Sequence, residues 1–191
     1  LANSYAATTD PADLDYDRLL RQALGDPGDI IDVVYVPQVP DSSNGQATIK
    51  AIVNDRVGNV KEYFYEAGRR LVMAREFTGR SNPDQPTTDT QNRPGPSLRP
   101  DDPPYFETSW SWNDDKLCTQ VLHPNGNSRT QRHELELSSS AGRLIRGNLR
   151  QIIRDPGPLG GDQAQIIESF TYASGFAGCE GGTSFVASHM D

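Results

Sequence analysis

Apolar and polar residues alternate along most of this chain, which is the pattern of β-strands that bury one face. β-Branched residues crowd positions 29–39, and a second apolar run follows at 47–53. Residues 62–77 have the pattern of two short strands joined by a turn at Ala-Gly-Arg, and residues 105–112 alternate aromatic and polar side chains. Clusters of Gly, Asn and Asp separate these runs, as they do in hairpins. The pattern therefore predicts about eight to ten short antiparallel strands.

One segment near the N-terminus has helical spacing instead. In residues 10–26, Asp10 is a suitable N-cap, Pro11 suits the first turn, and a Gly-Asp-Pro-Gly sequence ends the segment. A loose apolar stripe follows the helical period and comprises Leu14, Tyr16, Leu20, Ala23 and Leu24. We therefore expect an α+β fold, in which this N-terminal helix packs on an antiparallel, hairpin-rich sheet.

The Ala-Gly-Arg hairpin occurs a second time, at residues 133–148. There His133, Leu135 and Leu137 would share one face of a strand, and the glutamates between them would face solvent. A repeated hairpin would widen the sheet. Chance is the alternative, because turns of this kind are common.

A proline-rich stretch interrupts the strand pattern at residues 81–104, which hold seven of the fourteen prolines. Such a sequence cannot build a core, so we expect a long irregular loop, with a domain linker as the alternative. The flanks are short, and we expect one domain over residues 1–191. Residues 1–9 would form an extended arm, and residues 187–191 resemble a tag remnant.

The charge balance narrows the class of partner. The net charge is −8, the pI is about 4.8, and the mean hydropathy is −0.65. Nucleic acids and anionic membranes attract clustered Lys and Arg, so neither is an expected partner. No apolar run approaches the roughly 20 residues of a membrane span. Because the first residue is Leu1, we expect that a signal or anchor has been removed.

Two cysteines, Cys118 and Cys179, lie 61 positions apart, which fits no short metal motif. A single disulfide in an oxidising compartment is the preferred interpretation, and two buried free thiols are the alternative. We therefore expect an extracellular or periplasmic protein at the cell surface.

Candidate catalytic residues are few, and we expect no enzyme and no cofactor. The sequence His-Glu-Leu-Glu-Leu at 133–137 lacks the second histidine of the zinc-protease motif, and His133 is expected to be structural. Acidic turns could bind calcium weakly, although solvated turn carboxylates are the simpler interpretation. Trp110 and Trp112 would share one strand face, where core packing is expected and an exposed aromatic contact surface is the alternative.

The C-terminal part resembles the globular domains of W-type minor type IV pilins and J-type minor pseudopilins of type II secretion. The residues that carry this resemblance are Leu144, Ile145 and Arg146, then Ile166, Ile167, Phe170 and Tyr172. The resemblance implies a sheet laid over the end of a helix, a disulfide near the C-terminus, and a role in filament assembly, adhesion or secretion. Other pilin or filament subunits would be the partners. Within the proline-rich loop, the candidate contact residues are Asp84, Arg93, Arg99, Asp101 and Asp102.

Two other classes remain open. The first is a secreted β-rich adhesin or filament subunit unrelated to pilins, whose N-terminal arm pairs with the sheet edge of a neighbour. The second is a secreted enzyme or ligand-binding barrel whose site residues the sequence does not identify.

Overall fold

The computed structural model of the chain forms two compact units, residues 1–108 and residues 109–191, which are described separately. The residues that the structure describes are 1–25, 29–55, 57–81, 94–142, 145–172 and 187–189. None of the helices within these ranges is both long and apolar enough to cross a membrane.

Almost all regular structure in the described residues is β-strand. The first unit contains β1 (Ala2–Tyr5), β2 (Leu19–Ala23), β3 (Ile30–Pro37), the 3-10 turn η1 (Ser42–Asn44), β4 (Ile49–Asn54), β5 (Asn59–Tyr65), β6 (Leu71–Arg80) and the start of β7 (Tyr105–Trp112). The second contains the end of β7, then β8 (Cys118–Leu122), β9 (Ser128–His133), α1 (Glu134–Leu137), β10 (Leu149–Asp155), β11 (Ile166–Tyr172) and β12 (Ala187–His189).

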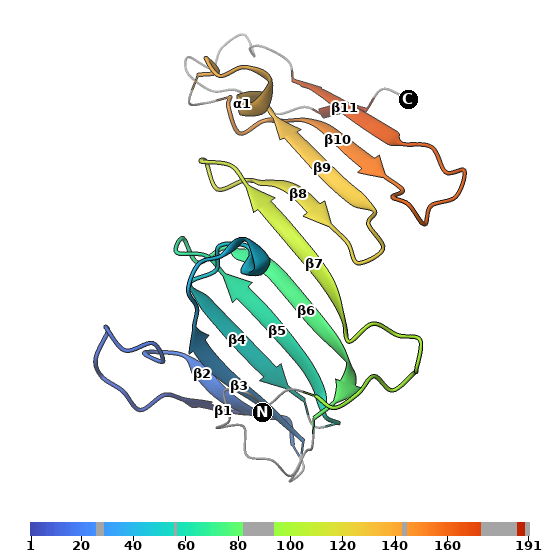
Figure 1. Cartoon of the computed structure of the whole chain (residues 1–191). Helices are drawn as coiled ribbons and strands as arrows, with labels where there is room; N and C mark the ends of the chain where they lie inside the picture. The colour runs from blue at the N-terminus through green and yellow to red at the C-terminus, as the bar shows by residue number, and fades with distance from the viewer. Residues whose placement is uncertain (26–28, 56, 82–93, 143–144, 173–186, 190–191) are drawn as a thin grey trace. The chain divides into compact units, whose positions relative to one another are not determined.

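Each unit is an antiparallel meander. From β1 to β6 every strand pairs with the strand that follows it, and the same is true from β7 to β12 (Figure 1). The predicted succession of hairpins is therefore present, and β7 coincides with the strand expected at 105–112. Most buried apolar side chains lie on β4, β5 and β6, and the second unit adds Ile152 and Ile153 of β10.

The two faces of the first sheet carry different residues. On one face, cross-strand neighbours alternate large and small in the row Tyr35, Ala51, Tyr63, Ala74. Ala51 is buried between the half-buried Tyr35 and Tyr63, and Ala74 is buried beside Tyr63. The opposite face carries Phe64, which is 2% exposed. Strand alternation thus places Phe64 opposite its tyrosine neighbours, as the sequence indicates.

The predicted N-terminal helix is wrong, and with it the α+β fold class. Residues 11–17 form consecutive turns, and the following Leu19–Ala23 segment is strand β2. Aspartate side chains stabilise those turns: Asp10 accepts from the Ala12 amide at 2.9 Å, and Asp13 from the Asp15 amide at 3.0 Å. Such bonds offer the backbone an alternative to the helix, and β2 gains ladders with both β1 and β3.

The predicted second copy of the hairpin is also wrong. β9 ends at His133, and the next four residues form α1 rather than a continued strand. Leu137 is consequently 52% exposed rather than on a buried face. The partner of β9 is β10, which begins only at Leu149. Non-local bonds favour this break in the strand, since the amides of Glu134 and Leu135 donate to the carbonyls of residues 148 and 146.

A different repeat exists, in the turns. Four hairpins in the described part of the chain share a five-residue turn. In each, the amide of residue 1 donates to the carbonyl of residue 5, and the amide of residue 4 donates to the carbonyl of residue 1. The fourth residue always has a positive φ, at 82° for Gly58, 61° for Arg69, 64° for Lys116 and 78° for Gly126. This is the type I turn with a G1 bulge, whose twist matches that of the flanking strands. One turn geometry thus closes two hairpins in each meander.

Gly58 provides a test of this turn. A Cβ at this position would lie 2.8 Å from the Ser81 carbonyl oxygen, and the positive φ disfavours any L-residue. Gly58→Ala should lower the free energy of unfolding by about 1–3 kcal/mol, measured by urea denaturation. Gly142→Ala is the control, because nothing lies within 4 Å of a Cβ there. Equal stability of the two variants would contradict the strained-turn account.

Candidate functional site

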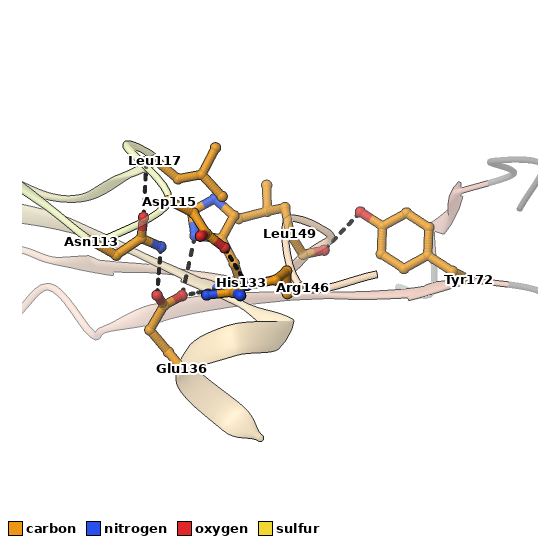
Figure 2. Close-up of polar contacts among 8 residues, drawn as sticks. All are labelled: Asn113, Asp115, Leu117, His133, Glu136, Arg146, Leu149 and Tyr172. Carbon is orange, nitrogen blue, oxygen red and sulfur yellow. Dashed lines mark hydrogen bonds and ion pairs between the residues drawn. The ribbon is translucent and has the colours of Figure 1, made fainter. Parts of the chain in front are cut away.

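A network of polar contacts in the second unit joins the end of β9, helix α1 and the β7–β8 turn (Figure 2). Glu136 is at its centre. One of its oxygens, Oε2, accepts from the His133 backbone amide at 2.6 Å and lies 3.2 Å from His133 Nδ1. The other oxygen accepts from Asn113 Nδ2 at 2.6 Å. Glu136 therefore caps α1 and also fixes the turn that contains Asn113.

Further contacts extend the network on both sides. Asn113 Oδ1 accepts from the Leu117 amide at 2.9 Å, which closes the turn. In the same turn, Asp115 pairs with Arg146, with 2.5 Å between Oδ2 and Nε. On the other side, the Tyr172 hydroxyl donates to the Leu149 carbonyl at 2.8 Å and ties β11 to β10 (Figure 2).

The electrostatics of Glu136 follow from these contacts. Burial alone would raise the pKa of this carboxyl group, but the hydrogen bonds from the Asn113 side chain and the His133 amide outweigh burial, so the pKa is lower than usual. The charged form is therefore the one that the fold stabilises.

This network is suited to structure rather than to chemistry. His133 is 6% exposed, so a substrate could not reach its ring without local opening. Both carboxylate oxygens of Glu136 already accept hydrogen bonds from the chain itself. Within the described residues, no three His, Cys, Asp or Glu side chains are grouped as they would be around a metal ion. The network holds α1 and the β7–β8 turn in place.

The pH dependence of stability should report on this network. A carboxyl group whose folded pKa lies below its ordinary value of 4.5 stabilises the fold above that pH, and the contribution is lost as the pH falls through the lower folded value. Thermal melting from pH 6 to pH 3 should therefore show a smaller acid-induced loss of stability for Glu136→Gln than for the unmodified chain. Asp114→Asn, an exposed change in the same turn, is the control. Identical pH profiles for Glu136→Gln and the unmodified chain would contradict this role.

The first unit contains a second charged cluster, on the same face as Phe64. Lys50 Nζ lies 2.7 Å from Glu62 Oε1, and their side chains are only 11% and 6% exposed. Arg75 lies directly across the strands from Glu62 and bonds Glu107 at 2.8 Å. Its guanidinium lies 5.0 Å from the Phe64 ring centre.

A pocket of about 320 Å³ is lined by Lys50, Glu62, Phe64 and Arg75 together with residues of the β3–β4 loop. The Arg75 guanidinium also lies 4.8 Å from the Tyr105 ring centre, so two aromatic rings are within cation–π distance of this cation. The two cations of this pocket, Lys50 and Arg75, are each paired with a carboxylate. The cluster is therefore compensated internally, and we interpret it as part of the packing of the sheet face.

The contact residues proposed for the proline-rich loop lie partly outside the described residues. Asp84 and Arg93 are outside them. Of the remainder, Arg99 and Asp101 are exposed and Asp102 is half-buried, in a turn closed by the Asp102 amide and the Arg99 carbonyl at 3.2 Å. This part of the loop is irregular, as expected, and its role in binding stays a prediction.

The remaining predicted residues are described individually. Trp110 and Trp112 are both half-buried on β7, so they form neither a closed core nor a free aromatic surface. Cys118 is bonded to no other cysteine among the described residues, and burial raises the pKa of its thiol. Cys179 lies outside the described residues, so the proposed disulfide stays a prediction.

Sequence reasoning missed both clusters. A signal for the Lys50–Glu62 cluster was available in the sequence. Glu62 shares one strand face with Phe64, and a buried glutamate requires a nearby cation. The contact between Asn113 and Glu136 had no comparable signal, since it joins positions 23 residues apart.

The sequence was also compared with known proteins. It matches no model of a protein family, and no curated protein matches it.

Proposed function

We propose that this chain is a non-enzymatic structural subunit that assembles with other protein subunits by strand pairing at β1. The observation that carries the proposal is the state of that strand. All four residues of β1 are exposed, and its inner edge pairs with β2. Among the described residues, no strand pairs with its outer edge.

The outer edge of β1 lacks the usual protection against pairing. Natural edge strands are commonly blocked by charged side chains, by proline or by a cover. No charged side chain and no proline occurs in residues 1–9. Unpaired amides and carbonyls of such an edge can form a ladder with a strand of another chain, and backbone bonds then supply affinity without a specialised pocket.

This proposal follows the filament-subunit alternative rather than the pilin head. A pilin head needs a helix beneath its sheet, and here residues 11–17 form turns and Leu19–Ala23 a strand instead. The expected partners, other filament subunits, and the expected extracellular or periplasmic location are retained as parts of the proposal. The two charged clusters support a non-enzymatic role, since their polar groups are engaged within the fold.

Self-association tests the proposal directly. Analytical ultracentrifugation of the unmodified chain should show assembly that increases with concentration. Asn3→Lys adds a charge to β1 and, in a self-paired edge, places like charges close together, so it should weaken assembly about tenfold or more. Gln120→Lys adds the same charge at an exposed position of β8, away from this edge, and should leave assembly unchanged.

Two outcomes would contradict strand pairing at β1. One is a chain that stays monomeric up to about 1 mM, which corresponds to negligible self-affinity. The other is that Asn3→Lys and Gln120→Lys weaken self-assembly equally, which would indicate a general effect of added charge.

A further inference from the structure

The second unit contains a pocket of about 530 Å³ between the β8–β9 turn and the β10–β11 loop. The two segments lie at the same end of their strands, since Ser128 at the start of β9 pairs with Asp155 at the end of β10 (Figure 1). They approach closely, because a Cβ on Gly157 would lie 2.5 Å from the Asn127 amide nitrogen. The wall of the pocket is thus built by packing of one turn against the other.

Two arginines lie side by side in this pocket. Arg129 of β9 and Arg154 of β10 are direct cross-strand partners, and both line the pocket. Like charges in that position destabilise a sheet unless anions compensate them. Glu168 pairs with Arg154, whereas Arg129 has no carboxylate partner among the described residues.

The one carboxylate that lines the pocket is already engaged. Asp155 accepts from the Ser128 hydroxyl at 3.5 Å and, through its other oxygen, from the Gln165 side-chain amide. It therefore does not neutralise Arg129. A guanidinium with free donors binds a carboxylate through two parallel hydrogen bonds, which is the geometry that Arg favours.

Apolar surface lies beside the arginine pair. Ile166 is the cross-strand partner of Arg154 and is 56% exposed, and Leu159 of the β10–β11 loop is 76% exposed. Both residues line the same pocket. A ligand that carries an aliphatic group next to its charge would cover this surface and gain from its burial.

We propose that this pocket binds a carboxylate that adjoins a branched aliphatic group, with Arg129 as the residue that bonds the carboxylate. The ligand class includes N-acyl leucine and the C-terminus of a peptide that ends in an aliphatic residue. This site is independent of strand pairing at β1, so either proposal can fail without the other.

N-Acetylleucine is a suitable probe, and N-acetylleucinamide is its uncharged match. In titrations of the whole chain followed by amide chemical shifts, the acid should bind at least about tenfold more tightly than the amide, because the amide lacks the charge-assisted bonds. The shifts should concentrate in the β8–β9 turn. Inorganic phosphate, which has charge but no aliphatic group, should compete weakly.

The residue assignment is tested with two matched variants. Arg129→Gln should weaken binding of N-acetylleucine by about tenfold or more, while Arg132→Gln on the same strand should not change it, because Arg132 lies outside the pocket. If Arg129→Gln fails to fold, Arg129→Lys and the comparison of acid with amide decide instead. The proposal is overturned by equal binding of acid and amide, by phosphate binding as tightly as N-acetylleucine, by no binding of the acid, or by unchanged binding in a folded Arg129 variant.

Discussion

Replacing Glu62 with Ala should lower the free energy of unfolding by about 3–5 kcal/mol, because it leaves the Lys50 ammonium buried without its anion. The two side chains are 6% and 11% exposed, and 2.7 Å separates Oε1 from Nζ. The Phe64 ring lies 5.7 Å from the same ammonium and cannot replace a full negative charge. The loss should be visible as a lower urea midpoint with an unchanged slope.

Matched variants separate the effect of burial from that of charge. The double variant Lys50→Met/Glu62→Leu removes both charges at once and should be within about 1 kcal/mol of the unmodified chain, or more stable. Glu76→Ala breaks the Lys61–Glu76 pair, which joins β5 to β6 of the same sheet and whose side chains are 43% and 62% exposed. It should cost about 0–1 kcal/mol. If Glu62→Ala costs no more than Glu76→Ala, the pair is not buried as described.

Phe64→Ala should also cost about 3–5 kcal/mol, since the ring is 2% exposed and lies at the centre of β4, β5 and β6. The change removes buried apolar area and leaves a cavity. It also removes the ring that lies 5.0 Å from the Arg75 guanidinium. Phe106→Ala is the control, because that ring is 41% exposed, and it should cost about 1 kcal/mol or less.

The measurement should distinguish the two units. Both tryptophans of the chain, Trp110 and Trp112, lie in the second unit, so tryptophan fluorescence reports on that unit. Circular dichroism follows the strands of both units. A loss below about 1 kcal/mol for Phe64→Ala would mean that the core of the first unit lies elsewhere.

Strand positions could be predicted because they follow from local chemistry. Alternation fixes which side chains share a face, so residues 105–112 become β7, and Phe64 and Tyr63 occupy opposite faces. The turns also carry local signals, since Gly at positions 58 and 126 accommodates the positive φ that the G1 bulge requires. These features depend on residues within one hairpin.

The tertiary structure decided the features that depend on distant residues. Residues 10–26 have caps and spacing suited to a helix, yet Leu19–Ala23 becomes a strand because β1 and β3 offer hydrogen-bond partners on both sides. The break of β9 at His133 depends on the carbonyls of residues 146 and 148, and on Asn113 from another turn. The pocket beside Arg129 exists only because the β10–β11 loop packs against the β8–β9 turn. Local pattern determined most of the strands and which side chains share a face. Pairing between distant segments determined which competing local preference prevailed, because several non-local hydrogen bonds together outweigh a helix propensity of a few tenths of a kcal/mol per residue.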